Sequence, residues 1–268
     1  MKSIIKKDSG EKGKTLAVFC GVHGNEKAGV YAVKKILKNI NIKKGVVYFV
    51  FANPKAIKEN KRFIDKNLNR CFLDNQKGNF YEEKRVKDLI KILECSDALL
   101  DIHASTSPKT IPFVITDSGL DIVKNMNFKI IATGFDNIEP GATDGYMKNK
   151  GKIGICLECG YAGKSEENVD IAYNSVLQFL QYFNAIENKI SNYNINQKIL
   201  HVDKVQKVTS KKFKLTKTFA DFETIKKGSI IAKDEVKSYI TNKERVILFG
   251  TPNKPIGAEA YILGTWIK

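Results

Sequence analysis

The sequence is short of the features that mark membrane and secreted proteins. No stretch of its 268 residues approaches the roughly 18 uninterrupted apolar residues of a membrane-spanning helix. The N-terminal segment MKSIIKKDSG carries lysines but lacks the apolar run of about 7–15 residues that defines a signal peptide. We therefore expect a cytoplasmic protein with no membrane partner.

Cysteine is also sparse, and its distribution argues against a disulfide framework. The five cysteines are odd in number and widely spread. Cys156 and Cys159 have the C-x-x-C spacing, but no second pair completes a structural zinc site. Because both lie in the apolar segment IGICLECG, we interpret them as buried thiols.

Acidic residues are outnumbered, and the formal net charge is +16. Such an excess raises the question of nucleic-acid binding. However, the charge is nearly all scattered lysine, arginine is scarce, and no recognition helix or stacking aromatic signature accompanies it. We expect a lysine-rich solvated surface and no nucleic-acid partner. A non-enzymatic binder of acidic ligands or nucleic acid remains the rival from another functional class.

Apolar residues make up 43% of the chain and are arranged as strands that alternate with helices. The predicted strands cover 16–20, 45–54, 98–105, 112–117, 125–134 and 155–160, and the predicted helices cover 28–37, 81–97 and 169–186. This alternation predicts an α/β fold with a largely parallel sheet covered on both faces. Segments 55–80 and 136–152 are predicted loops. Beyond residue 190, short alternating strands predict a second unit, so we divide the chain into a catalytic domain, 1–190, and a small all-β domain, 191–268.

Two of the three histidines follow or end predicted strands of the first domain. His23 and Glu26 form an H-x-x-E turn after the first strand, and His103 ends the segment ALLDIHAS. Taken alone, each motif favours a plainer interpretation: an exposed pair for His23 and Glu26, and a capping or core histidine for His103. Together, two imidazoles and one carboxylate are the ligand set of catalytic zinc. We assign no role to His201.

Three further candidates for a functional role are an arginine, a polar segment that ends in arginine, and a glutamate in an apolar strand. Arg62 and the segment Asn67-Leu68-Asn69-Arg70 lie in the long loop after the second strand, and arginine binds carboxylates through two parallel hydrogen bonds. An ordinary surface loop is the alternative. Glu158 lies within an otherwise apolar strand, where burial would raise its pKa and suit it to proton transfer near neutrality.

These segments, in this order, resemble a known family. GVHGNEKAG, NP followed by an arginine and NLNR, DIHAS and LECG are similar to the motifs of the succinylglutamate desuccinylase/aspartoacylase family, within the wider zinc carboxypeptidase group. The resemblance covers residues 15 to about 185, and GAEAYILG looks like the family's closing segment. It implies an α/β fold with a zinc carboxypeptidase-like mixed sheet flanked by helices and a small C-terminal all-β domain.

The resemblance also implies the chemistry. One zinc ion per chain would be held by His23, Glu26 and His103. Glu158 would act as the general base that takes a proton from zinc-activated water and delivers it to the leaving amine. Arg62 would polarise the scissile carbonyl. The implied reaction is hydrolysis of the amide bond of a small N-acyl amino acid.

The substrate residues are less well matched. Asn69 and Arg70 match the pair that grips the α-carboxylate. Asn67 replaces an aspartate that would accept a hydrogen bond from the first zinc histidine, which predicts weaker zinc binding unless another carboxylate such as Asp65 compensates. Lys148 lies nearest to the position of an arginine that holds a second substrate carboxylate, and a solvated loop lysine is the equal alternative.

The leading prediction is therefore a zinc-dependent deacylase whose partner is a small-molecule N-acyl amino acid. A zinc carboxypeptidase acting on small peptides or cell-wall fragments is the first rival, because it would use the same groups. The sequence does not identify the acyl group or the amino acid, and it leaves open whether the chain forms a homo-oligomer.

Overall fold

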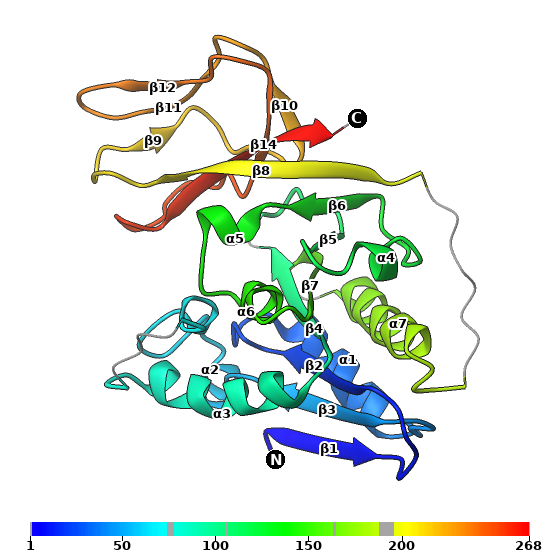
Figure 1. Cartoon of the computed structure of the whole chain (residues 1–268). Coiled ribbons are helices and arrows are strands. Elements are labelled where there is room, and N and C mark those ends of the chain that lie inside the picture. The colour runs from blue at the N-terminus through cyan, green and yellow to red at the C-terminus, as the bar shows by residue number, and fades with distance from the viewer. Residues whose placement is uncertain (1, 74–77, 106, 163–164, 188–195, 268) are drawn as a thin grey trace.

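The computed structural model describes residues 2–73, 78–105, 107–162, 165–187 and 196–267. They form a mixed α/β structure with two sheets (Figure 1). The larger sheet has eleven strands in the order β1-β3-β2-β4-β7-β5-β6-β8-β14-β13-β10, and the smaller has three antiparallel strands in the order β12-β11-β9. The strands are β1 (Ile4–Asp8), β2 (Thr15–Cys20), β3 (Val46–Phe51), β4 (Ala98–Ser105), β5 (Phe113–Ile115), β6 (Ile130–Thr133), β7 (Ile153–Tyr161), β8 (Lys198–Lys207), β9 (Lys214–Leu215), β10 (Glu223–Ile225), β11 (Ile230–Lys233), β12 (Ser238–Ile240), β13 (Arg245–Leu248) and β14 (Glu259–Ile267).

The centre of the large sheet is parallel and fully covered. Strands β3, β2, β4 and β7 are parallel neighbours, and every residue of β4 is buried. Continuous apolar strands are typical of parallel strands that are covered on both faces. The remaining pairings make the sheet mixed, since β5 runs antiparallel to β7 and β1 runs antiparallel to β3. The predicted mixed sheet flanked by helices is confirmed.

Helices cover both faces of this centre. They are α1 (Lys27–Leu37), α2 (Pro54–Glu59), η1 (Leu68–Arg70), α3 (Tyr81–Cys95), α4 (Leu120–Val123), α5 (Phe135–Ile138), α6 (Thr143–Asn149) and α7 (Glu166–Tyr182). Leu16 and Val18 of β2 pack in the core cluster that contains α1 and α7, whereas Phe19 packs in the cluster that contains α3. Alternate residues of one strand thus serve opposite faces. None of these helices is long and apolar enough to cross a membrane.

The C-terminal strands extend the same sheet. Strand β8 pairs in parallel with β6, with Ile130 opposite Lys198, so that β8, β14, β13 and β10 continue the eleven-stranded order (Figure 1). A shared cluster joins Phe113 and Ile130 to Leu200 and Ile262. The small antiparallel sheet lies at the outer end of these strands. The division of the chain at residue 190 stays a prediction.

Several short elements differ from the predicted pattern. The predicted loops contain α2, η1, α5 and α6, none longer than seven residues. Such short helices lack enough turns for apolar periodicity to show in a sequence. Strand β1 reads IIKKD and lies at the edge of the sheet, where lysines suit an exposed strand.

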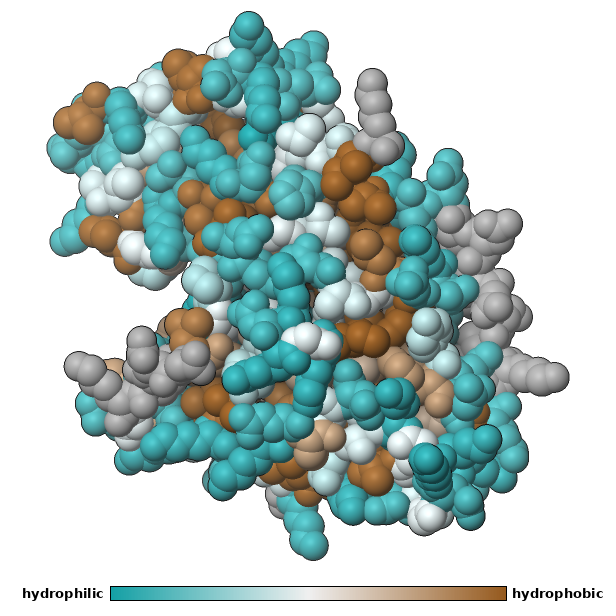
Figure 2. Space-filling view, viewed as in Figure 1, coloured by the Kyte–Doolittle hydropathy of each residue, from teal (hydrophilic) through white to brown (hydrophobic). Residues whose placement is uncertain are grey.

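Hydrophilic residues cover most of the face shown in Figure 2, as the lysine-rich sequence predicts. That face is hollowed between the C-terminal strands and the part of the molecule that contains α2 and α3.

Candidate active site

The candidate residues gather where neighbouring parallel strands end. Strands β2, β4 and β7 lie side by side, so their carboxyl ends meet at one edge of the sheet, the usual place for ligands in an α/β fold. His23 follows β2, His103 lies near the end of β4, and Glu158 lies near the end of β7. His103 and Glu158 are paired across the ladder. The backbone register alone therefore places these two side chains next to each other.

The turn between His23 and Glu26 needs glycine. A Cβ atom on Gly24 would lie 2.1 Å from the carbonyl carbon of Ala56, so the turn packs directly on the backbone of α2. The amide of Gly24 donates to the carbonyl of Arg62 at 3.1 Å, which ties this turn to the arginine loop. Glu26 then occupies the N-cap position of α1 without a side-chain capping hydrogen bond, which leaves its carboxylate to face the histidines. Close packing thus fixes the positions of both H-x-x-E side chains.

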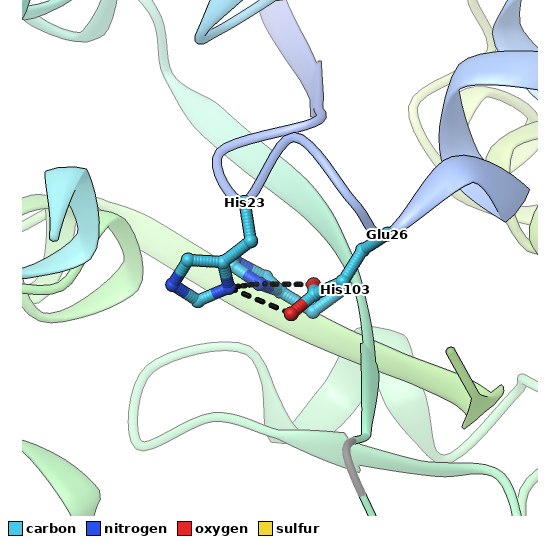
Figure 3. Close-up of side chains that lie close together, drawn as sticks. All are labelled: His23, Glu26 and His103. Atoms are coloured by element: carbon cyan, nitrogen blue, oxygen red, sulfur yellow. Dashed lines mark hydrogen bonds and ion pairs between the residues drawn. The ribbon is translucent and has the colours of Figure 1, made fainter. Parts of the chain in front are cut away.

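The three predicted ligands converge in the interior (Figure 3). Nδ1 of His23 lies 2.8 Å from Oε1 of Glu26, and Nδ1 of His103 lies 3.1 Å from Oε2 of Glu26. The two Nδ1 atoms are 3.2 Å apart. Each of the three residues is at most 4% exposed. One ligand atom from each lies within 4.8 Å of the others, close enough to share a metal ion.

The surroundings of the two imidazoles show that this donor set fits zinc. Nε2 of His23 lies 3.0 Å from Oδ1 of Asn67, and Nε2 of His103 lies 3.0 Å from Oδ2 of Asp101. With the ring protons donated to these oxygens, both Nδ1 lone pairs face one another, an arrangement that a cation between them stabilises. Tetrahedral zinc with bonds of about 2.0–2.1 Å to nitrogen holds two such atoms about 3.3 Å apart.

Electrostatics keeps His23 in the ligand form. Burial, helped by the positive charge of Arg62, lowers the pKa of His23 to about 4. The imidazole is therefore neutral at physiological pH, as metal binding requires.

Glu158 faces the same cavity with a free oxygen. Its Oε2 is buried and has no hydrogen-bond partner among the described residues. Burial raises the pKa of Glu158 to about 8, and the negative charge of Glu26 adds to the effect. A carboxyl group in this state exchanges a proton readily near neutrality.

Arg62 lies beside the three predicted ligands, in a loop that is hydrogen-bonded to a buried glutamate of α3. Its Nη1 donates to Oε1 of Glu26 at 3.0 Å. Glu82 of α3 is fully buried, and its carboxylate accepts the backbone N–H groups of residues 64, 65 and 66 at 2.7–3.1 Å. The sequence reading missed Glu82. The available signal was a pair of acidic residues, Glu82 and Glu83, next to the apolar positions of the α3 segment.

Asn69 and Arg70 also line the cavity. Nε and Nη2 of Arg70 each lie 2.6 Å from Oε2 of Glu139. Oδ1 of Asn69 accepts the backbone N–H of Thr143 at 3.3 Å. The structure therefore brings Asn69 and Arg70 together in the cavity, with Glu139 as a partner of Arg70 that the sequence analysis did not identify, and their binding of a substrate carboxylate stays a prediction.

Lys148 and Asp65 lie elsewhere. Nζ of Lys148 pairs with Asp117 at 3.1 Å and with Asp136 at 3.5 Å, and Lys148 is not among the described residues that line the cavity. Oδ2 of Asp65 accepts the backbone N–H of Tyr81 at 2.9 Å. The hydrogen bond to His23 comes from Asn67, so Asp65 does not supply the carboxylate that the sequence suggested as compensation.

The two C-x-x-C cysteines are buried free thiols, as predicted. Sγ of Cys159 donates to the carbonyl of His103 at 3.0 Å, and Cys156 lines the cavity. The full set of described lining residues is His23, Glu26, Arg62, Asn69, Arg70, His103, Ala104, Ser105, Ile115, Phe135, Glu139, Ala142, Asp144, Cys156, Glu158, Phe249 and Glu259. Asp144 and Glu259 were also missed, because isolated acidic residues in turn-rich segments read as solvated.

Comparison with known proteins gives a consistent result. The model of the succinylglutamate desuccinylase/aspartoacylase catalytic domain matches residues 12–183. A probable aspartoacylase from Nostoc is 23% identical over 192 residues, which are 63% of this chain and 65% of that protein. A probable aspartoacylase from Trichodesmium erythraeum is 28% identical over 207 residues, covering 67% of this chain and 68% of that protein.

A solved structure shares the fold. Succinylglutamate desuccinylase from Vibrio cholerae superposes with a TM-score of 0.81 at 18% identity, and the match covers 98% of this chain and 85% of that one. The chain thus spans less than two thirds of the length of the Nostoc relative. In the comparison with the Vibrio cholerae structure, nearly the whole of this chain superposes. On the family match over residues 12–183, this chain belongs to the succinylglutamate desuccinylase/aspartoacylase family.

Proposed function

We propose that this protein is a zinc-dependent deacylase that hydrolyses the amide bond of a small N-acyl amino acid. The observation that carries the proposal is one cavity in which the buried set His23, Glu26 and His103 faces the unpartnered carboxylate oxygen of Glu158. A buried set of this kind is typical of the zinc site in this family. The names of the relatives, probable aspartoacylase and succinylglutamate desuccinylase, agree with amide hydrolysis.

In the proposed mechanism, zinc would activate the attacking water and Glu158 would transfer the proton. Zinc bound by the three ligands would supply a Lewis acid and lower the pKa of water from 15.7 to about 7. Glu158 takes a proton from the attacking water at its carboxylate and returns it to the nitrogen of the leaving amine. Its burial in the cavity, which raises the pKa of the carboxyl group, suits it to proton exchange near neutral pH.

Arg62 stabilises the charge that develops on the carbonyl oxygen. Its guanidinium lines the cavity and its Nη1 lies 3.0 Å from Oε1 of Glu26, so it can reach a carbonyl placed beside the ligands. Loss of a single donor of this kind costs about 3–4 kcal/mol in other hydrolases. We assign to Asn69 and Arg70 the α-carboxylate of the substrate, which orients the amide.

The size of the cavity favours this reading over the carboxypeptidase rival. Its volume is about 110 Å³, smaller than the roughly 300–1,000 Å³ of sites for drug-sized ligands. A compact N-acyl amino acid suits this space better than an extended peptide.

The proposal is tested by loading the protein with zinc and assaying acetyl, succinyl and peptidyl amino acids in parallel. We expect one zinc ion per chain by elemental analysis and hydrolysis of at least one N-acyl amino acid. Glu158→Gln should lower kcat by about 10²–10⁴-fold with zinc content unchanged. Faster cleavage of dipeptides would favour the carboxypeptidase. Full activity of Glu158→Gln, or a protein that binds no zinc, would rule the mechanism out.

A further inference from the structure

The cavity holds more acidic groups than the hydrolytic reaction needs. Among the described lining residues the basic ones are Arg62 and Arg70, and the acidic ones are Glu26, Glu139, Asp144, Glu158 and Glu259. Glu26 belongs to the metal ligands and Glu158 to proton transfer. Three carboxyl groups are therefore left without a role in hydrolysis.

Of these three carboxyl groups, that of Glu139 gives the clearest indication of a ligand. It is only 8% exposed, and its Oε2 pairs with Arg70 at 2.6 Å. Its Oε1 is buried without a hydrogen-bond partner among the described residues. A buried carboxylate oxygen that lacks a partner is costly, so a ligand that donates to it would relieve that cost.

Glu259, at the start of β14, adds a second carboxyl group to the same region. Burial raises the pKa of Glu259, Lys254 only partly offsets this, and the charge of Glu139 raises the pKa further. Burial also raises the pKa of Asp144 to about 7, with help from Asp136. Burial is the main cause of both shifts, and neighbouring carboxylates add to them.

The same cavity is poorly equipped for a second substrate carboxylate. Lys148, the cation that the sequence offered for it, is engaged by Asp117 and Asp136. Arg70 is already paired with Glu139. An anionic side chain would therefore meet Glu139 and Glu259 in a cavity whose two lining arginines are already ion-paired, Arg62 with Glu26 and Arg70 with Glu139.

We propose that the cavity selects N-acyl amino acids with a basic side chain, whose ammonium or guanidinium group is received by Glu139 and Glu259. This inference rests on the proposed deacylase function and names its substrate class. The cation would donate to the free Oε1 of Glu139, while Arg70 stays bound to Oε2 of the same carboxylate and available to the α-carboxylate. Like charges brought together in a site of this kind are strongly disfavoured, which excludes acidic side chains.

The test compares three substrates of similar length on the zinc-loaded protein: N-acetyl-L-ornithine, N-acetyl-L-norvaline and N-acetyl-L-glutamate. We expect kcat/KM to fall in that order, with at least about a tenfold difference between the ornithine and glutamate derivatives. Calorimetry with free L-ornithine and L-glutamate gives a second readout that needs no turnover, and ornithine should bind more tightly. Equal or stronger selection of glutamate in both measurements would overturn the inference.

Two variants locate the selectivity. Glu139→Gln and Glu259→Gln should each reduce the ornithine-to-glutamate ratio of kcat/KM by about tenfold. Glu235→Gln, on the exposed surface, is the matched control and should leave the ratio unchanged. A melting curve identifies a variant that fails to fold, and the other then decides. An unchanged ratio in a folded variant would contradict the proposal.

The two levels of the proposal fail in different ways. If all three substrates are hydrolysed without a charge preference, only the side-chain inference is wrong. If none is hydrolysed by the zinc-loaded protein, the deacylase function is in question, and the calorimetric comparison still decides whether the cavity prefers a basic amino acid.

Discussion

At the scale of single residues, the two imidazoles of the proposed zinc site are held by unequal partners. Oδ2 of the fully buried Asp101 accepts from His103 and also from the hydroxyl of Thr143 at 2.6 Å. His23 instead meets the neutral amide oxygen of Asn67, which is shared with the backbone N–H of Asn69. A carboxylate raises the basicity of an imidazole ligand more than an amide does. The His23 side of the site should therefore bind the metal more weakly.

Asn67→Asp is expected to tighten zinc binding by about tenfold, because the new carboxylate would strengthen the His23 ligand. Competition with a chromogenic chelator measures the change without reference to turnover. Asn39→Asp, which adds the same charge at an exposed position, is the control and should change nothing. If both variants match the wild type, the amide at position 67 does not limit zinc affinity.

Asp144 predicts how stability changes with pH. Its pKa is raised by burial from 3.8 to about 7, so the folded state holds a proton that the unfolded chain releases. That contribution to stability is complete below pH 3.8 and is lost as the pH rises through about 7. By linkage the loss is at most on the order of 4 kcal/mol for this group.

Urea unfolding of the metal-free protein between pH 4 and 8 measures this slope. Asp144→Asn should flatten it and make the variant more stable than the wild type at pH 8. Asp121→Asn, whose side chain is 89% exposed, should retain the wild-type slope. A steep slope that persists in Asp144→Asn would assign the pH dependence to another group.

Site residues that belong to a sequence motif could be predicted, whereas residues that only the fold brings to the cavity could not. His23, Glu26 and His103 were identifiable because the histidines are few and end apolar segments, and the structure brings them within 4.8 Å. Glu139 lies in a predicted loop and Glu259 begins an alternating segment near the C-terminus, and neither belongs to a ligand motif, so nothing in the sequence distinguishes them from solvated glutamates. Long-range packing alone brings the buried Glu139 and the half-buried Glu259 to one cavity.

At the scale of elements, helix α3 holds the loop that carries Arg62 in place through hydrogen bonds. The Glu82 carboxylate accepts three consecutive backbone N–H groups of that loop and the side-chain amide of Asn53 at 3.1 Å. Glu82→Ala should therefore lower the free energy of unfolding by about 3 kcal/mol or more, since hydrogen bonds to a buried charge are lost together.

The same substitution should lower kcat more than metal affinity, because Arg62 would lose its fixed position while the ligands keep theirs. Lys84→Ala, at an exposed position of the same helix, is the matched control. Thermal unfolding, zinc titration and single-substrate kinetics together separate the effects. Wild-type stability in Glu82→Ala would show that the loop is held by other contacts.

Long, buried helices and strands could be predicted from the sequence, whereas short ones could not. Strands β2, β4 and β7 and helices α3 and α7 were predicted within a few residues, because long apolar segments have a clear period. The helices η1 and α6 were read as loop, since they are held by tertiary contacts such as the bond from Thr143 to Asn69. These two short helices carry part of the cavity wall, so the site was less predictable than the sheet.

At the scale of the whole molecule, the sheet passes through the predicted domain boundary. Strand β8 pairs with β6, and the cluster that contains Phe113 and Leu200 draws on both sides of residue 190. We expect a chain of residues 1–190 to lack cooperative unfolding and to expose apolar surface, because it loses the strands that cover this cluster. Calorimetry and dye binding test this, with the full chain as control. A sharp unfolding transition in the shorter chain would establish residues 1–190 as an autonomous domain.

The paired register of His103 and Glu158 also bears on how such a protein can change over time. Two adjacent parallel strands hold the proposed metal ligand His103 and the proposed proton-transfer group Glu158 in one backbone ladder, so neither can shift without unpairing both strands. Glu139 lies outside this ladder and Glu259 begins a distant strand. If the proposed roles hold, substitutions there would change which substrates bind while the residues assigned to hydrolysis stay in place, so a new substrate preference would evolve without an inactive intermediate.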